Sequence, residues 1–358
     1  MATETRAHAP FGLPGRVRLS PLTITGFVVV ALVAVWLAVN IAKTPADFYE
    51  LLLIGVTNGA VYGLVALGYS LVYGILELIN FAHGDVFMLG GMLVATLTVT
   101  VFTLDGSESA IVLWGAILAM LAVAMAFCGT LNATIELVAY RRLRHAPRLA
   151  PLITAIGMSF ILQNVGLVWL DVWKGDVRPA SVPAILPDGD IFSIAGVAYT
   201  WDKLIILLIT VPVLVLLIWL VQRTRQGKAM RATAQDRDAA AMMGINVNRT
   251  ISFTFLIAGA LAGAAALLYA LYITNVRFTE GFRLGLIAFT AAVVGGIGNL
   301  PGAVLGALLI GLIEAFNNGL GWHSPGSDWT QSIIFAILIL VLVFRPEGLL
   351  GERTPEGA

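Results

Sequence analysis

The stretch LVYGILELINFAHGDVFMLGG, residues 71–91, interrupts a long apolar run with polar residues and then becomes apolar again. The interruption consists of Glu77, Asn80, His83, Gly84 and Asp85. A helix that crosses a bilayer needs about 20 mostly apolar residues, and such runs lie on both sides of these five positions. The stretch therefore predicts two membrane helices separated by a polar break.

The composition of the whole chain agrees with a membrane protein. Of 358 residues, 59% are hydrophobic and 12% are charged, against roughly a quarter charged in an ordinary soluble domain. The 37 glycines suit helices that pack closely in a membrane. The formal net charge of +0 gives no sign of a nucleic-acid partner. We therefore expect an all-α polytopic membrane protein.

About ten apolar runs satisfy or approach the length that a membrane helix needs. They cover residues 22–41, 51–75, 85–103, 110–135, 150–171, 204–221, 251–272, 284–297, 302–318 and 329–344. The eighth and ninth runs are short, so the sequence leaves open whether they cross fully or are re-entrant.

The distribution of charge predicts the sidedness, because Lys and Arg accumulate in short cytoplasmic loops. Residues 140–148 and 222–250 are rich in arginine, whereas residues 103–109 and 171–203 are acidic or balanced. The first pair of loops is expected inside and the second outside, with both termini cytoplasmic. We predict a cytoplasmic N-terminal extension at 1–20, a transmembrane domain at 21–348 and a cytoplasmic tail at 349–358.

The polar break at Asn80, His83, Gly84 and Asp85 allows two interpretations. In the structural one, Asp85 caps the next helix and Gly84 takes a positive φ or a close backbone contact. In the functional one, these groups line a translocation pathway, because polar groups at membrane depth often do. His83 has no clustered ligands around it in the sequence, so no metal site is expected.

A second break in the apolar pattern, VVGGIGNLPGAVLGALLIGLIEA at residues 293–315, resembles the first. Gly296, Asn299 and Gly302 echo Gly74, Asn80 and Gly84, although the spacing differs. These three residues join the candidates for a pathway or a helix break. Two such breaks suggest parallel repeats about an axis along the membrane normal.

Signatures of enzymatic chemistry are missing from the sequence. In GGIGNLPG, Pro301 occupies the third glycine position of a dinucleotide-binding motif, and Gly227 and Lys228 are followed by alanine rather than Ser or Thr. No nucleophile with a base and an orienting group is evident. We therefore expect neither an enzyme nor a chain that binds a cofactor of its own.

The positions of four acidic residues bear on whether transport would be coupled to an ion gradient. Glu77, Asp85, Glu136 and Glu314 all fall near the ends of predicted spans, where snorkelling or capping explains them. An ion-coupled secondary transporter usually places ionisable groups in mid-span. This kind of transporter remains the alternative from another functional class.

The segment KAMRATAQDRDAAAMM, between Gly227 and Gly244, is rich in helix formers. It predicts a short helix on the membrane surface whose contact face would combine four small or flexible side chains, Met230, Ala234, Ala241 and Met243. The alternative is a solvated basic loop that only fixes the topology.

The pattern DAAAMMG within this segment favours the first interpretation. Asp238, Ala239, Ala240 and Gly244 match the acidic-Ala-Ala-x-x-x-Gly core of the coupling loop in ABC importer permeases, although the usual downstream proline is missing. Together with residues 58–91 and 291–315, this loop makes the chain resemble the permeases of the high-affinity branched-chain amino acid ABC importers. The resemblance is to the first of their two non-identical permease subunits.

This resemblance implies an ABC importer permease fold in a bacterial inner membrane, surrounded by lipid. Its implied partners are a second permease, two ATP-binding cassette ATPases that use ATP, and a periplasmic substrate-binding protein. The coupling loop at 222–250 would contact an ATPase through five residues, Arg231, Asp238, Ala239, Ala240 and Gly244. Branched-chain amino acids are the favoured substrates, and urea, short amides or aromatic acids are the alternatives.

Overall fold

The computed structural model describes residues 21–144, 146–147, 149–187, 189–194 and 197–351, so the predicted extension at 1–20 lies outside the described residues. The chain divides into two compact units, Met1–Pro45 and Ala46–Ala358. In the described part of the first unit, the chain forms helix α1 (Pro21–Lys43). The second unit contains the features on which function depends.

The second unit is mostly helical. Its α-helices are α2 (Pro45–Leu76), α3 (Ala82–Thr96), α4 (Ala110–Ile135), α5 (Leu149–Lys174), α6 (Trp201–Arg223), α7 (Arg225–Gln235), α8 (Arg237–Met242), α9 (Val247–Ile273), α10 (Glu280–Gly295), α11 (Leu300–Gly319) and α12 (Ser327–Phe344). Short π- or 3₁₀-helical segments are η1 (Leu97–Val101), η2 (Glu136–Tyr140) and η3 (Arg141–Leu143).

The expectation of a purely helical chain needs a small correction. Strand β1 (Ala180–Ser181) pairs with β4 (Asn275–Val276), and β2 (Asp190–Ile194) pairs with β3 (Val197–Thr200), both antiparallel. The β2–β3 hairpin lies in the long loop predicted to be outside. Polar loop segments of this length can satisfy their backbone groups by pairing locally.

Each of the ten predicted apolar runs falls on a helix, but not every one of these helices is long enough to span a membrane. Among the described residues, eight helices are long and apolar enough to cross a membrane. Helix α10 has 16 residues and would cover only about 24 Å at the helical rise, against roughly 30 Å of hydrocarbon. Helix α11, with 20 residues, reaches the required length.

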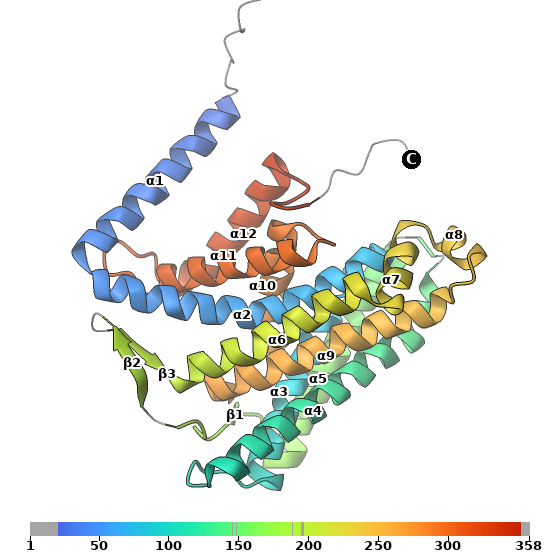
Figure 1. Ribbon diagram of the computed structural model, residues 1–358, viewed down its shortest axis with the longest axis horizontal. Coiled ribbons are helices and arrows are strands. Elements are labelled where there is room, and N and C mark those ends of the chain that lie inside the picture. The colour runs from blue at the N-terminus through green and yellow to red at the C-terminus, as the bar shows by residue number, and fades with distance from the viewer. Residues whose placement is uncertain (1–20, 145, 148, 188, 195–196, 352–358) are drawn as a thin grey trace, which may run out of the picture. The chain divides into compact units, whose positions relative to one another are not determined.

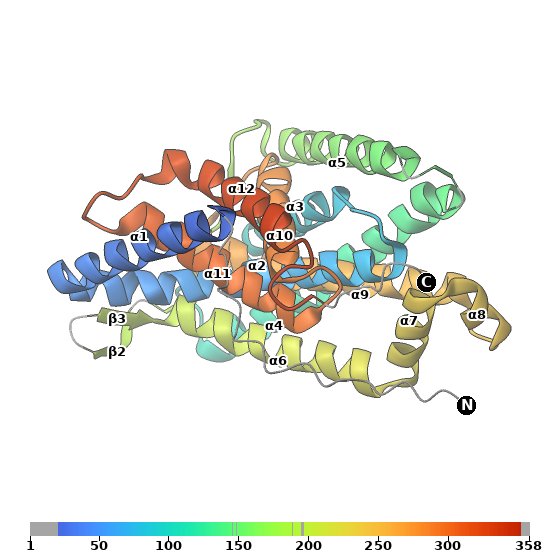
Figure 2. The same ribbon diagram turned by 90° about the horizontal axis from the view of Figure 1, so that it is seen from above.

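The long helices of the second unit form a buried centre with more exposed helices around it. Helices α2, α3, α9 and α11 are mostly buried, whereas α5, α6 and α12 are mostly exposed. Figure 1 shows α7 and α8 at one end of α2, α6 and α9, and the β2–β3 hairpin at the other end. Figure 2 shows α5 and α6 on opposite sides of the central helices.

Glycines make the closest helix contacts, as the composition suggests. A Cβ atom on Gly59 of α2 would lie 2.7 Å from the Cα of Leu308 in α11. A Cβ atom on Gly129 of α4 would lie 3.0 Å from the backbone oxygen of Leu256 in α9. Small residues allow such backbone approach, which replaces the hydrophobic effect as a source of packing energy in lipid.

Two helices of the second unit begin well inside the bundle. The His83 ring at the start of α3 packs on Tyr69 of α2, with ring centroids 4.9 Å apart, about two turns before α2 ends. Residues 77–81 therefore run back along α2 before α3 begins. Helix α10 begins beside the same turn of α3, because a Cβ atom on Gly281 would lie 2.7 Å from the Cα of Asp85.

Candidate functional site

The predicted coupling loop folds as two short helices with well-defined ends. Asp236 begins α8 by accepting hydrogen bonds from the backbone N–H groups of Asp238 and Ala239, both at 2.9 Å. Gly244 ends it with a φ of 83°, and the N–H of Ile245 donates to the carbonyl of Ala240 at 3.1 Å. This is a Schellman ending, which favours glycine at the left-handed position. The glycine of the acidic-Ala-Ala-x-x-x-Gly pattern thus specifies where α8 stops, whereas its start is set by Asp236, two residues before the pattern.

The contact face that the sequence predicts for this loop is wrong. Met230 is buried at 3% exposure on α7, whereas Met242 and Met243 are 82% and 83% exposed at the end of α8. A single helix would have aligned these side chains, but the chain turns at Asp236 and divides them between two helices. Met242 and Met243 at the tip are therefore the large apolar side chains that the loop exposes, beside smaller exposed residues such as Ala234 and Ala241.

The five coupling residues predicted by sequence differ in exposure. Asp238 and Gly244 are exposed, Ala239 is half-buried, and Ala240 is buried at 4% exposure against its own chain. Arg231 is exposed but donates a hydrogen bond from Nη1 to the backbone oxygen of Val221, the end of α6. Ala240 and Arg231 thus stabilise the loop, and the exposed positions remain free to meet a partner.

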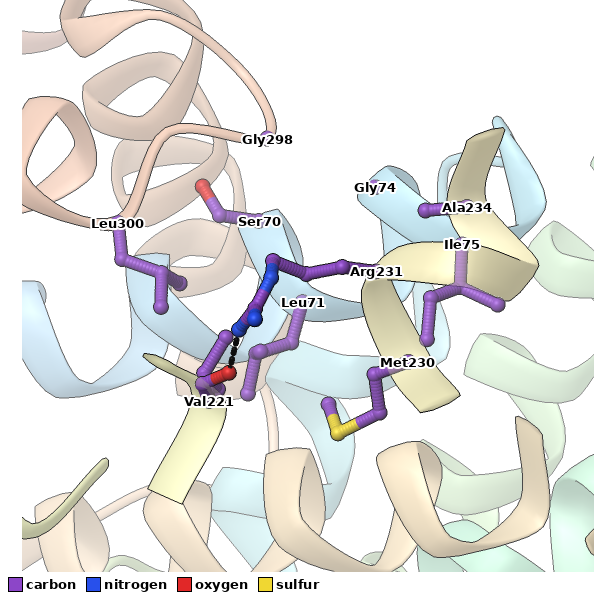
Figure 3. A pocket seen from close by; sticks show the side chains of 10 residues that line it. All are labelled: Ser70, Leu71, Gly74, Ile75, Val221, Met230, Arg231, Ala234, Gly298 and Leu300. Atoms are coloured by element: carbon purple, nitrogen blue, oxygen red, sulfur yellow. Dashed lines mark hydrogen bonds between the residues drawn. The ribbon is translucent and has the colours of Figure 1, made fainter. Parts of the chain in front are cut away.

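A small cavity of about 100 Å³ lies where α7 meets α2 and the turn between α10 and α11. Figure 3 shows Arg231 reaching across it to Val221, with Ser70 and Gly298 near its other side. The Ser70 hydroxyl is buried without a hydrogen-bond partner among the described residues. A Cβ atom on Gly74 would lie 3.7 Å from the Cα of Gly298. The second polar break thus meets the end of α2 beside the coupling loop.

Arg237 connects the start of α8 to the polar break at residues 77–81. Its Nη2 donates to the backbone oxygen of Ile75 at 3.0 Å. Ile75 belongs to the last turn of α2, whose carbonyl groups have no partner within the helix. The sequence identified Arg237 only as one of the charges that predict sidedness, because its partner lies 162 residues away.

A buried ionic cluster fixes the helix that follows the coupling loop. Glu136, completely buried, accepts from Arg144, and its second oxygen accepts from Ser252 of α9 at 2.5 Å. Arg144 also donates to Asn248 at 2.5 Å, and Arg141 donates to Ser252 at 2.8 Å. Burial lowers the pKa of Arg144, and the Glu136 carboxylate opposes this shift. The cluster ties the end of α4 to the first turns of α9.

Asn80 in the first break belongs to a buried polar network. Its Oδ1 accepts from the Tyr140 hydroxyl at 2.8 Å, and its Nδ2 lies 3.4 Å from Oδ1 of Asn132. Asn132 in turn donates to the backbone oxygen of Phe255 at 2.7 Å. The break is thereby tied to α4, η2 and α9.

The remaining residues of the first break do not act as helix caps. Helix α3 is preceded by Phe81 without a side-chain cap, and the positive φ of this segment is at Glu77, 55°. Gly84 is helical, and its contribution is close approach: a Cβ there would lie 2.7 Å from the Cα of Gly285. His83 is completely buried. The predicted capping by Asp85 is therefore wrong, and of the two possibilities predicted for Gly84 the structure has the close backbone contact and not the positive φ.

Asp85 lies one turn inside α3 and is completely buried. Its Oδ2 accepts from the Ser159 hydroxyl of α5, and Gln163 donates to the same hydroxyl at 3.2 Å. Its Oδ1 has no hydrogen-bond partner among the described residues and abuts Gly281, where a Cβ would lie 2.6 Å away. Asp85 thus joins α3, α5 and the start of α10.

Snorkelling does not explain most of the acidic residues near the span ends. Glu77 is exposed, but Asp85 and Glu136 are completely buried and Glu314 is only 9% exposed. Glu314 of α11 accepts from the Tyr62 hydroxyl of α2 at 2.6 Å. The expectation that snorkelling or capping explains all four is corrected for these three, because packing of distant helices covers them.

The second break has a different local geometry from the first. Gly296 has a φ of 112°, and Asn299 caps α11 by accepting from the N–H of Gly302 at 3.0 Å. Its Nδ2 donates to the backbone oxygen of Leu350 at 2.7 Å, and the N–H of Leu349 donates to Val294 at 2.9 Å. Residues 349–351 of the predicted tail are thus packed on this break, and residues 352–358 lie outside the described residues.

Comparison with known proteins gives a consistent result across most of the chain. Residues 51–342 match the family model described as branched-chain amino acid transport system / permease component. The high-affinity branched-chain amino acid transport system permease protein BraD of Pseudomonas aeruginosa is 40% identical over 312 residues, which cover 86% of this chain and 97% of BraD.

Two further relatives carry similar descriptions. The permease protein LivH of the corresponding high-affinity system in Escherichia coli is 35% identical, covering 86% of this chain and 97% of LivH. The probable branched-chain amino acid transport permease protein LivH of Methanocaldococcus jannaschii is 25% identical, covering 80% of this chain and 88% of the relative.

Proposed function

We infer the function of this chain from the family to which it belongs, the permease components of branched-chain amino acid transport systems. The chain is a multi-pass membrane protein with several long apolar helices. It acts as the transmembrane permease subunit of an ATP-driven importer for branched-chain amino acids. The relatives that cover most of its length carry this description, which favours these substrates over urea, amides or aromatic acids.

The complete importer contains this chain, a second, non-identical permease, two ATP-binding cassette ATPases and a periplasmic substrate-binding protein, in the bacterial inner membrane. The ATPases bind and hydrolyse ATP, so this chain is not itself an enzyme. Family membership supports this assembly rather than an ion-coupled secondary transporter, the alternative from another class. Copurification with the products of neighbouring genes tests it: one copy of each permease is expected, and a transport-competent homodimer would contradict it.

The observation that carries the mechanism is the exposed tip of α8 on a well-anchored loop. Met242 and Met243 are the apolar side chains available to a cytoplasmic partner, and flexible methionines suit protein contacts. Arg237 links the same helix to the end of α2. An ATPase that moves α8 therefore moves the helix break that begins after Ile75.

A paired charge substitution tests this docking surface. Changing Met242 and Met243 to glutamate should abolish ATPase recruitment and uptake while leaving the chain folded, because both side chains are exposed. The matched control is Val177→Glu, a half-exposed residue in the loop predicted to be outside, which should leave recruitment intact. Ala240→Arg is a poorer test because Ala240 is buried. Normal recruitment by the double variant would refute docking at this tip.

A further inference from the structure

Three acidic side chains are buried within the helices of the second unit, and their partners differ. Glu136 is paired with Arg141 and Arg144. Asp85 is completely buried and accepts from Ser159. Glu314 accepts from the Tyr62 hydroxyl at 2.6 Å and has no ion pair within the part of the chain that the structure describes. An ionisable side chain at membrane depth usually indicates function, so Glu314 requires an explanation.

Arg283 is the cation that lies near Glu314. Gly302 packs on Gly295 and Gly306 packs on Ala291 across the antiparallel pair α10 and α11, and this register brings Arg283 level with Glu314. The charge of Arg283 also acts on Glu314, on Tyr62 and on Tyr269 of α9. Its Nε and Nη2 donate to Oε2 of Glu280, one turn earlier in α10, at 3.0 and 2.8 Å. Four helices, α2, α9, α10 and α11, thus bring one arginine and two glutamates to one region.

This region lies at the depth of the membrane interior rather than at its surface. Tyr62 is near the middle of α2. The strand residue Val276 packs 3.3 Å from a Cβ placed on Gly91, and Gly281 packs on Gly84 two turns earlier in α3. The chain between α9 and α10 therefore runs inward along α3 before α10 starts. Non-helical backbone at this depth is tolerated where it is covered by protein or lines a water-filled cavity.

The Arg283 side chain is only partly covered by the rest of this chain. It is 42% exposed, and the side chain of Glu280 is 14% exposed. A guanidinium at this depth is costly against lipid, so Arg283 faces a polar space or the second permease. Interrupted helices whose N-termini point into such a space form the substrate sites of many transporters.

We propose that the first turn of α10, together with Glu314, binds the charged head of the transported amino acid. Arg283 and the N–H groups at the start of α10 hold the α-carboxylate, because the positive end of the helix dipole adds to the guanidinium charge. Glu314 holds the α-ammonium group, and Glu280 balances Arg283 when no substrate is bound. Asp85 is not a ligand, because it is completely buried beneath Gly281.

The proposal rests on the proposed function, and it names the part of this chain that meets the substrate. It predicts that each site charge recognises one charge of leucine. Two leucine analogues test the two contacts separately. The first, 3-methylbutylamine, lacks the carboxylate, and the second, 4-methylpentanoate, lacks the ammonium group. Binding is measured by competition with labelled leucine on the assembled transporter in nanodiscs, in the absence of binding protein.

Arg283→Gln should weaken leucine binding about tenfold or more, since a charge-assisted contact is lost, but leave competition by 3-methylbutylamine unchanged. Glu314→Gln should weaken leucine binding similarly and leave competition by 4-methylpentanoate unchanged. Tyr62→Phe removes only the hydrogen bond to Glu314 and should retain binding within about threefold. Glu108→Gln, in an exposed loop, is the matched control for loss of a carboxylate and should behave as the wild type.

Three results would overturn the proposal. One is a failure of the binding pattern itself: both charge variants bind leucine as strongly as the wild type, or the wild-type transporter binds none at millimolar concentration. Another is an equal loss for both analogues in each variant. The third is reduced assembly of both Glu314→Gln and Tyr62→Phe, which would make their contact only a tie between α2 and α11. ATP-driven leucine uptake by the wild-type complex with its binding protein is measured in parallel, and its absence would instead refute the proposed function.

Discussion

The contact between α3 and α10 allows a sharp test of how the interior of this protein is packed. Gly84→Ala adds one methyl group that would lie 2.7 Å from the Cα of Gly285 and even closer to the carbonyl oxygen of Gly281. Both neighbours are backbone atoms, which cannot rotate away. Overpacking of this kind costs about 1 to 3 kcal/mol, and the better helix propensity of alanine returns up to about 1 kcal/mol. We expect a net loss of about 1 to 2 kcal/mol.

The measurement is thermal unfolding of the purified chain in detergent, followed by size-exclusion chromatography. The control is Gly115→Ala in α4, where a Cβ would meet nothing within 4 Å. This control has the same change in helix propensity without the contact, so its stability should equal or slightly exceed that of the wild type. Gly84→Ala should unfold at a lower temperature. Equal stability of the two variants would refute the close approach of α3 and α10.

Three further predictions concern the anchors around the coupling loop. Arg237→Gln removes the charged donor to Ile75 and should raise the ATP hydrolysed per leucine imported severalfold without reducing assembly; an unchanged ratio would contradict this role. Glu136→Ala leaves Arg144 buried and unpaired, at about 3 to 5 kcal/mol, so thermal stability equal to that of the wild type would count against the cluster. Asn80→Ala removes the acceptor of the Tyr140 hydroxyl, at about 1 to 3 kcal/mol. Its effect should not add to that of Tyr140→Phe in a double-mutant cycle, and strict additivity would show that the two side chains are independent.

The sequence by itself determined where the helices lie. Every predicted apolar run coincides with a helix, and the boundaries agree within a few residues, for example 329–344 against Ser327–Phe344. Length, hydropathy and helix-ending residues are local properties, so they can be identified without knowledge of the fold. The end of α8 was also visible, because Gly244 of the predicted pattern stops the helix through contacts within a few residues, although the cap at Asp236 lies outside that pattern.

The tertiary structure alone decided which polar groups are buried and which partners they have. Glu77 and Asp85 lie eight positions apart in the same break, yet the first is exposed and the second is completely buried. The difference comes from α5 and α10, which cover Asp85 and follow much later in the chain. The depth at which α10 begins, and hence the level of Arg283 relative to Glu314, likewise depends on packing between distant segments. Burial and charge pairing at these sites are set by which helices come together in space, and hydropathy along the chain does not encode that choice.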